Sequence, residues 1–133
     1  IIIDMTSIIV TDIEPDKGGL SLANHLKDPD FFNVDLYPNA RFKIAEFQDL
    51  KKVNNEGICY IKGNLTILNI TKPYTIKLKL FPEEDTIRVL GNIEVDRTDF
   101  NITYGSNSYF DIAADRAIDN IFDLNFKLIA TKY

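Results

Sequence analysis

The fold of this chain is decided by two stretches, GICYIKGNLTILN at residues 57–69 and KPYTIKLKLF at residues 72–81. Apolar and polar residues alternate strictly along both of them. In the first stretch, Cys59 and Ile61 fall on one face and Lys62 on the other. A repeat of two residues is typical of a β-strand with one buried face and one solvated face. The two stretches therefore predict neighbouring antiparallel strands that share an apolar face.

Four further stretches alternate in the same way and are also predicted to be strands. They cover residues 1–10, 40–47, 86–96 and 118–131. Turn-forming residues separate the strands, at positions 54–57, 69–72 and 82–85.

Helix is predicted in one place, at residues 20–27, where Leu22 and Leu26 lie one helical turn apart. The helix should end before Pro29, because the residue that precedes a proline avoids helical backbone angles. Residues 97–117 are less regular, and a single helical turn is predicted near residues 111–115. The chain thus has one or two short helices.

Six strands joined by short turns predict an all-β, antiparallel up-and-down meander that closes into a barrel or a strongly curled sheet. Six strands leave an open edge, which proteins usually avoid. The chain also begins with Ile1-Ile2-Ile3, inside an expected strand. We therefore expect a single domain over residues 1–133 that lacks one or two strands at its front. A homodimer in which a second copy covers the open edge is an alternative.

The composition is that of an ordinary globular domain, with 45% hydrophobic and 26% charged residues in a chain of 133. A net charge of −5 argues against binding to nucleic acid or to an anionic membrane through a general positive field. No apolar run approaches the ~20 residues of a transmembrane helix. The single cysteine excludes an intramolecular disulfide.

Four blocks of the sequence resemble one protein family, and together they cover nearly the whole chain. The blocks are DFFNV at 30–34 with YPNARF at 37–42, GNLTI at 63–67 with TKPYTI at 71–76, RTDF at 97–100, and IDMTSI at 3–8. The family is that of the YceI-like, or polyisoprenoid-binding, bacterial proteins. This chain has Asn69 and Asn101 where the family usually has glycine. Asparagine also tolerates a positive φ, so we expect both turns to be kept.

The resemblance implies a lipocalin-like β-barrel of eight antiparallel strands, of which about six lie in this chain. It also implies roughly two further strands ahead of the block at residues 3–8, in agreement with the expected open edge. Members of the family enclose an isoprenoid ligand, either a polyprenyl chain or an isoprenoid quinone, in the barrel. The implied function is therefore non-enzymatic binding, storage or transport of such a lipid in the periplasm or after secretion.

The candidate binding site is the inward, apolar face of the predicted sheet, together with one aromatic residue after the helix. It comprises Phe31, Phe42, Ile44, Leu65, Ile67, Ile76, Leu78, Val89, Ile93, Phe122, Leu124 and Phe126. Each methylene that leaves water on such a face contributes about 0.8 kcal/mol to binding. The alternative is that these side chains pack only against one another. The small residues Ala40, Gly63 and Gly91 favour a cavity, and Phe31 and Phe32 either cover one mouth or plug it.

Other reactive groups are few and have simpler explanations. His25, the only histidine, lacks an obvious nucleophile in the sequence, so we expect no catalytic residues. It could share a metal ion with Asp28 and Asp30, but Asp-Pro-Asp is also a turn sequence, and we expect neither a metal nor a cofactor other than a bound lipid.

Three further features also have structural interpretations. Cys59 is expected to be a buried small hydrophobe. The acidic residues 83–85 are expected to form a solvated turn. Arg97 and Asp99 could bind a ligand head group, although a structural role is the safer interpretation.

Two other function classes compete with a lipid carrier. One is a stress-related or interaction protein whose barrel is filled by its own side chains and holds no lipid. The other is a small enzyme that acts on a lipid, which the shortage of nucleophiles and bases disfavours. Binding of a hydrophobic small molecule is the hypothesis that the residues and the resemblance favour together.

Overall fold

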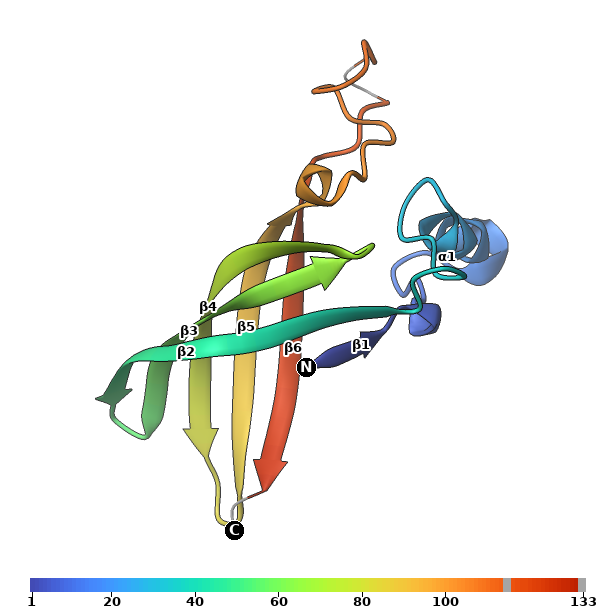
Figure 1. The fold of residues 1–133 in the computed structure, drawn as a ribbon. Helices are drawn as coiled ribbons and strands as arrows, with labels where there is room; N and C mark the ends of the chain where they lie inside the picture. Colours follow the sequence, from blue (N-terminus) through green and yellow to red (C-terminus); the bar gives the residue numbers. More distant parts are fainter. Residues whose placement is uncertain (114–115, 132–133) are drawn as a thin grey trace. The chain divides into compact units, whose positions relative to one another are not determined.

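A computed structural model describes residues 1–113 and 116–131, and within them six strands form one sheet in the order β1-β2-β3-β4-β5-β6 (Figure 1). Every strand is a neighbour of the strand that precedes it in the sequence. The strands are β1 Ile2–Asp4, β2 Asn39–Val53, β3 Glu56–Ile67, β4 Ile70–Pro82, β5 Thr86–Asp96 and β6 Ile121–Thr131. The predicted antiparallel up-and-down sheet of six strands is therefore confirmed.

Among the described residues there is one α-helix, α1, at Gly19–Lys27, close to the predicted 20–27. It begins where the chain turns sharply, because Gly18 has a φ of 113° and a β-carbon on Gly19 would collide with the carbonyl oxygen of Ile13. Its last residue is Lys27, and Asp28 caps it just before Pro29, as predicted. Short 3-10 helices occur at η1 Met5–Ser7, η2 Pro15–Lys17 and η3 Arg97–Phe100.

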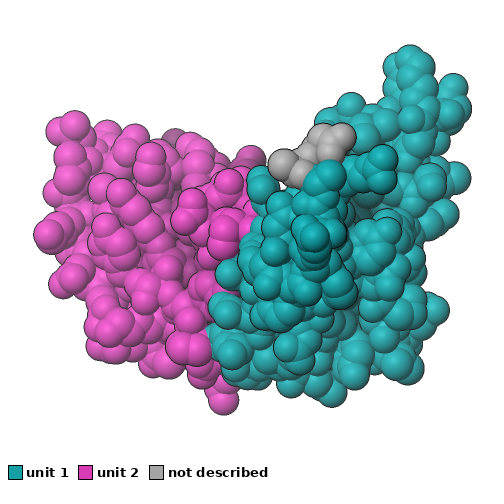
Figure 2. Space-filling model, turned by 90° about the horizontal axis from the view of Figure 1, so that it is seen from above, with its two compact units in different colours: residues 1–42, 65–72, 96–120 teal, residues 43–64, 73–95, 121–133 magenta. Residues whose placement is uncertain are grey.

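The chain forms two compact units, shown in different colours in Figure 2. Unit 1 contains residues 1–42, 65–72 and 96–120, and unit 2 contains residues 43–64, 73–95 and 121–133. Unit 1 holds α1, the 3-10 helices and the paired ends of β1 and β2. Unit 2 holds the bodies of the long strands β2 to β6.

Unit 2 follows the predicted alternation closely. On β3, Cys59 and Ile61 are buried while Tyr60 and Lys62 are exposed. On the next two strands the register places Leu78 of β4 opposite Gly91 of β5. A repeat of two residues therefore gives this unit a buried apolar face and a wet polar face.

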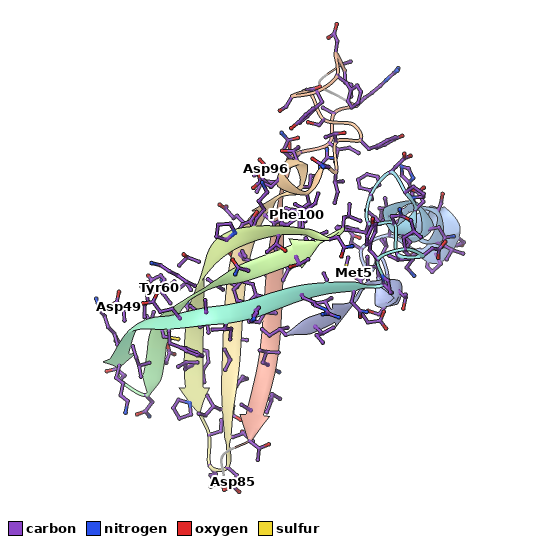
Figure 3. The ribbon with its side chains drawn as sticks, in the orientation of Figure 1. Met5, Asp49, Tyr60, Asp85, Asp96 and Phe100 are labelled. Carbon is purple, nitrogen blue, oxygen red and sulfur yellow. The ribbon has the colours of Figure 1, made fainter. Side chains whose placement is uncertain are left out.

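In unit 1, polar contacts to the backbone fix the loops around an apolar core that includes Phe100 and Ile102. The guanidinium of Arg97 is buried, and its three nitrogens donate to the carbonyl oxygens of Asp119 at 2.8 Å, Ile102 at 3.0 Å and Ile118 at 2.9 Å. These bonds fix both ends of the loop that follows η3. Asp96 caps the start of η3 by accepting from the Thr98 backbone N–H at 2.9 Å (Figure 3).

The predicted strand over residues 1–10 is wrong beyond Asp4. The carboxylate of Asp4 accepts from the backbone N–H of Thr6 at 2.9 Å and from its hydroxyl at 2.6 Å. These bonds support the tight turn η1 in place of further strand pairing, since such side chains compete with the sheet for backbone groups.

Strand β2 is longer than the predicted 40–47 and runs on to Val53. Along this extension Asp49 has a φ of 51°, a left-handed conformation inside a strand, near the outer end of β2 in Figure 3. A local irregularity of this kind breaks the alternation of side chains. The alternation therefore predicts an end of the strand at residue 47, six residues before its actual end at Val53.

Three smaller boundaries also differ from the prediction. The turn between β3 and β4 lies at Leu68 and Asn69, with φ values of 50° and 61°, and not at 69–72. Two consecutive positive φ values suit a two-residue hairpin. Strand β6 begins at Ile121, three residues later than predicted. The helical turn predicted at 111–115 lies partly outside the described residues, and residues 111–113 have no regular structure.

Candidate functional site

The twelve side chains predicted to line a cavity fall into three classes of exposure. Seven are buried: Phe31, Phe42, Leu65, Ile67, Ile76, Leu78 and Ile93. Four are half-buried: Val89, Phe122, Leu124 and Phe126. The last, Ile44, is 37% exposed. The half-buried side chains have surface left for a ligand, whereas the buried ones are already covered by protein.

Eight of the twelve belong to unit 2, on β2, β4, β5 and β6. The register brings two of them, Leu78 and Val89, close together, because Leu80 of β4 lies opposite Val89 of β5, next to the pair formed by Leu78 and Gly91. A β-carbon on Gly91 would collide with the ring of Phe126. The room that we expected Gly91 to leave is therefore occupied by that ring.

The other four belong to unit 1. Among them, Phe31 contributes to an aromatic cluster. Its ring lies 5.0 Å from the ring of His25 and 5.4 Å from that of Tyr104, while His25 and Tyr104 are also 5.0 Å apart. Phe31 is thus held within the core of unit 1, and its expected role at a mouth of the barrel stays a prediction.

A hollow of about 540 Å³ lies at one end of unit 2, and we call it the end hollow. It was not predicted, because part of its lining comes from the extension of β2 beyond Phe47 and from the β2–β3 turn. Its lining residues are Leu50, Lys52, Asn54, Asn55, Glu56, Gly57, Leu80, Pro82 and Ile87. The apolar members are aliphatic, and the polar members carry one amine, two amides and one carboxylate.

Two more hollows are lined neither by the twelve predicted residues nor by those of the end hollow. One of about 610 Å³ in unit 1 includes Asp30, Tyr104 and Arg116 in its lining. One of about 420 Å³ in unit 2 includes Glu46, Lys62 and Gly63. Gly63 borders this hollow together with the exposed Lys62 and Asn64 of the polar face, so the room that we expected Gly63 to leave on the inner face stays a prediction.

His25, Asp28 and Asp30 come together at the end of α1. The Nδ1 atom of His25 lies 2.7 Å from an oxygen of Asp28, and this hydrogen bond lowers the pKa of Asp28. The other Asp28 oxygen accepts from the backbone N–H of Asp30 at 2.9 Å. These contacts form the turn that ends the helix. The prediction that no metal binds here stays a prediction.

The remaining reactive groups have structural surroundings. Cys59 is buried, and desolvation raises the pKa of its thiol, which makes it a poor nucleophile. Glu83 accepts from Arg88 at 3.0 Å, and the pKa of Glu83 is lowered mainly by this bond. Asp85 lies at the exposed tip of the same turn (Figure 3).

Burial lowers the pKa of Arg97, whose bonds to three backbone carbonyls favour the structural role over head-group binding.

The sheet topology and the apolar face agree with a family comparison. A family model described as the YceI-like domain matches residues 1–130. The chain belongs to the YceI-like family. The resemblance stated from the four sequence blocks is thereby confirmed.

Several relatives and solved structures are similar to this YceI-like chain. A UPF0312 protein of Yersinia enterocolitica is 32% identical over 108 residues, which cover 75% of this chain and 53% of that protein. A UPF0312 protein of Pseudomonas aeruginosa is 36% identical over 82 residues, covering 62% of this chain and 40% of that protein. The chain thus spans about half, or less, of the length of these relatives.

Crystal structures of two YceI-fold proteins align along almost the whole chain. The YceI protein of Campylobacter jejuni gives a TM-score of 0.72 at 21% identity, covering 99% of this chain and 70% of that protein. BcnA of Burkholderia cenocepacia gives 0.73 at 21% identity, covering 98% and 72%. These alignments confirm the fold class. Within residues 1–113 and 116–131, no helix is long and apolar enough to span a membrane.

Proposed function

We propose that this YceI-like chain binds an isoprenoid lipid, either a polyprenyl chain or an isoprenoid quinone, and stores or transports it without changing it chemically. The observation that carries the proposal is the apolar face of unit 2. On that face, side chains from β5 and β6, including Val89, Leu124 and Phe126, are only half-buried. They offer apolar surface that a lipid can cover.

The energetics favour a ligand with several isoprene units. Five carbons per unit contribute about 4 kcal/mol if all are buried, at ~0.8 kcal/mol per carbon. Micromolar binding needs about 8 kcal/mol net. Association itself costs at least ~4 kcal/mol in lost freedom. About three buried isoprene units therefore suffice, and shorter apolar molecules should bind weakly.

The chemistry of this face supports holding a ligand over converting it. In the part of the chain that the structure describes, the inward positions of β5 and β6 carry aliphatic and aromatic side chains and glycine. The thiol of Cys59, on β3, has its pKa raised by burial. General acid–base catalysis needs a group whose pKa lies near the working pH and that can reach the ligand. These positions do not supply one.

Extraction of the purified chain with organic solvent, followed by mass spectrometry, tests the proposal. We expect a prenyl-chain mass, or uptake of added prenylquinone by chain that was purified empty. The variant Leu124→Asp should lose this uptake, because it places a charge on the apolar face. Its matched control, Asn125→Asp, lies at an exposed position of the same strand and should keep it. Empty extracts together with no uptake would reject the proposal.

A second candidate is a stress-related or interaction protein without a lipid. The contact between Gly91 and Phe126 favours it, because there the side chains fill their own space. Lipid-free protein that takes up no added quinone would support this candidate.

We also propose a periplasmic or secreted location, which rests on the family resemblance. Fractionation of cells that express the full-length gene would test it, with the cytoplasmic fraction as the outcome that contradicts it.

A further inference from the structure

Resting on the proposed function, we infer that the end hollow of unit 2 receives the head group of the lipid. We further infer that this head group is uncharged and carries oxygen acceptors, as a quinone ring or an alcohol does. The inference excludes a polyprenyl diphosphate as the preferred ligand.

The end hollow continues the apolar face of unit 2. Leu80, which lines it, lies two residues beyond the buried Leu78 on the same face of β4. Ile87, which also lines it, lies two residues before Val89 on β5. Two residues of a strand span about 7 Å. A chain that lies along the apolar face therefore reaches the hollow without leaving the sheet.

The size of the hollow suits a head group. Its volume of about 540 Å³ lies within the range of roughly 300–1,000 Å³ that is typical of small-molecule sites. Leu50, Pro82 and Ile87 provide apolar contacts for a flat ring. Gly57 has no side chain to fill the hollow. A larger residue there would crowd Leu80, because its β-carbon would lie 3.2 Å from the β-carbon of Leu80.

The rim decides which head group fits. Lys52 contributes one positive charge and Glu56 one negative charge, while the amides of Asn54 and Asn55 are neutral donors. Sites for phosphate groups usually gather several arginines or lysines, or use the N-terminus of a helix. This rim has one amine, a carboxylate that opposes it, and no helix. Carbonyl and hydroxyl oxygens, by contrast, need only hydrogen-bond donors.

The other hollows offer no better place for a diphosphate. The hollow in unit 1 is lined by one acid and one base, Asp30 and Arg116. The smaller hollow in unit 2 is lined by Glu46 and Lys62. Each of these two hollows therefore has one negative and one positive side chain, as the end hollow does. A diphosphate, which carries several negative charges, finds no excess of positive charge in these sites.

A series of ligands with the same tetraprenyl chain tests the inference on the unmodified protein. The probes are a tetraprenyl benzoquinone, geranylgeraniol and geranylgeranyl diphosphate, with affinities measured by equilibrium dialysis and mass spectrometry. We expect the quinone and the alcohol to bind at least about tenfold more tightly than the diphosphate. Equal or tighter binding of the diphosphate overturns the inference and leaves the proposed function standing. No binding of any of the three rejects the proposed function itself.

Two variants then locate the head group. Ile87→Trp fills the end hollow and should weaken quinone binding about tenfold. Its control, Ile129→Trp, adds the same side chain at a position on β6 that is 64% exposed and does not line the hollow. Thermal melting shows whether both variants fold. If the two variants bind the quinone equally well, the head group does not occupy the hollow.

Charge reversal gives a gain of function that misfolding cannot imitate. Glu56→Lys leaves the rim with two positive charges and no negative charge, so it should raise diphosphate affinity several-fold relative to that of the quinone. Glu94→Lys makes the same change at an exposed position of β5 that lines none of these hollows. An equal response of the two variants would overturn the placement of the head group.

Discussion

Unit 1 and unit 2 both bury apolar side chains, but their backbones are shaped in different ways, and the sequence reveals only one of them. Unit 2 is built from long strands whose alternating residues predict its buried face. Unit 1 is built from short elements around an apolar core, and side chains that bond to the backbone, such as Arg97 and Asp4, set the course of its loops. The two also differ in charge, with twelve acidic and six basic side chains in unit 1 against eight and nine in unit 2. Regular patterns can be read from a sequence, whereas single polar contacts depend on the folded backbone.

The largest effect is expected in unit 1, at Arg97. Arg97→Met removes three hydrogen bonds from a buried guanidinium and leaves carbonyl oxygens unsatisfied, which should lower the free energy of unfolding by about 4 kcal/mol. Urea denaturation followed by circular dichroism measures it. The control Arg88→Met removes a partly exposed ion pair with Glu83 and a cation–π contact with Phe81, and should cost only about 1 kcal/mol. Equal losses from the two variants would mean that the bonds from Arg97 to the backbone add no more to the free energy of unfolding than a surface ion pair does.

A core truncation in unit 2 should have the next largest effect. Ile61 is 1% exposed, so Ile61→Ala leaves a cavity and should destabilise the protein by about 3 kcal/mol. The same denaturation experiment measures it. Ile129→Ala, at an exposed position, should stay within about 0.5 kcal/mol of the unmodified protein. A small effect of Ile61→Ala would show that the apolar face of unit 2 is loosely packed.

The contact between Gly91 and Phe126 gives a smaller effect that can be reversed. Gly91→Ala forces the ring to move and should destabilise the protein by about 2 kcal/mol. Adding Phe126→Leu to Gly91→Ala should restore part of this loss, because the smaller side chain makes room. A double-mutant cycle measures the coupling between the two positions. Strictly additive effects would contradict the close packing described here.

The smallest effect concerns pH and returns to unit 1. The hydrogen bond from His25 lowers the pKa of Asp28 below its ordinary value of 3.8. A carboxylate with a lowered pKa in the folded state stabilises the protein above 3.8, and this contribution disappears as the pH falls through the folded value. Asp28→Asn should therefore flatten the loss of stability below pH ~4. Melting temperatures between pH 3 and pH 6 test this, and identical profiles would contradict it.

Strand positions in unit 2 could be predicted because burial there follows a simple period. Strand β5 was predicted at 86–96 and is found at Thr86–Asp96. The end of β2 could not be predicted, because the left-handed residue Asp49 and the charged residues after it hide the alternation. The end hollow was missed for the same reason. Alternation also cannot separate a buried side chain such as Leu78 from a half-buried one such as Val89.

Cys59 gives this protein a reporter of its own motion. Its thiol is the only one in the chain and lies covered on β3, so a labelling reagent reaches it only while that strand is transiently open. The rate of modification therefore measures how often the middle of the sheet opens locally. A molecule seated against the sheet would slow this reaction, which makes the native cysteine a kinetic sensor of occupancy that needs no added dye.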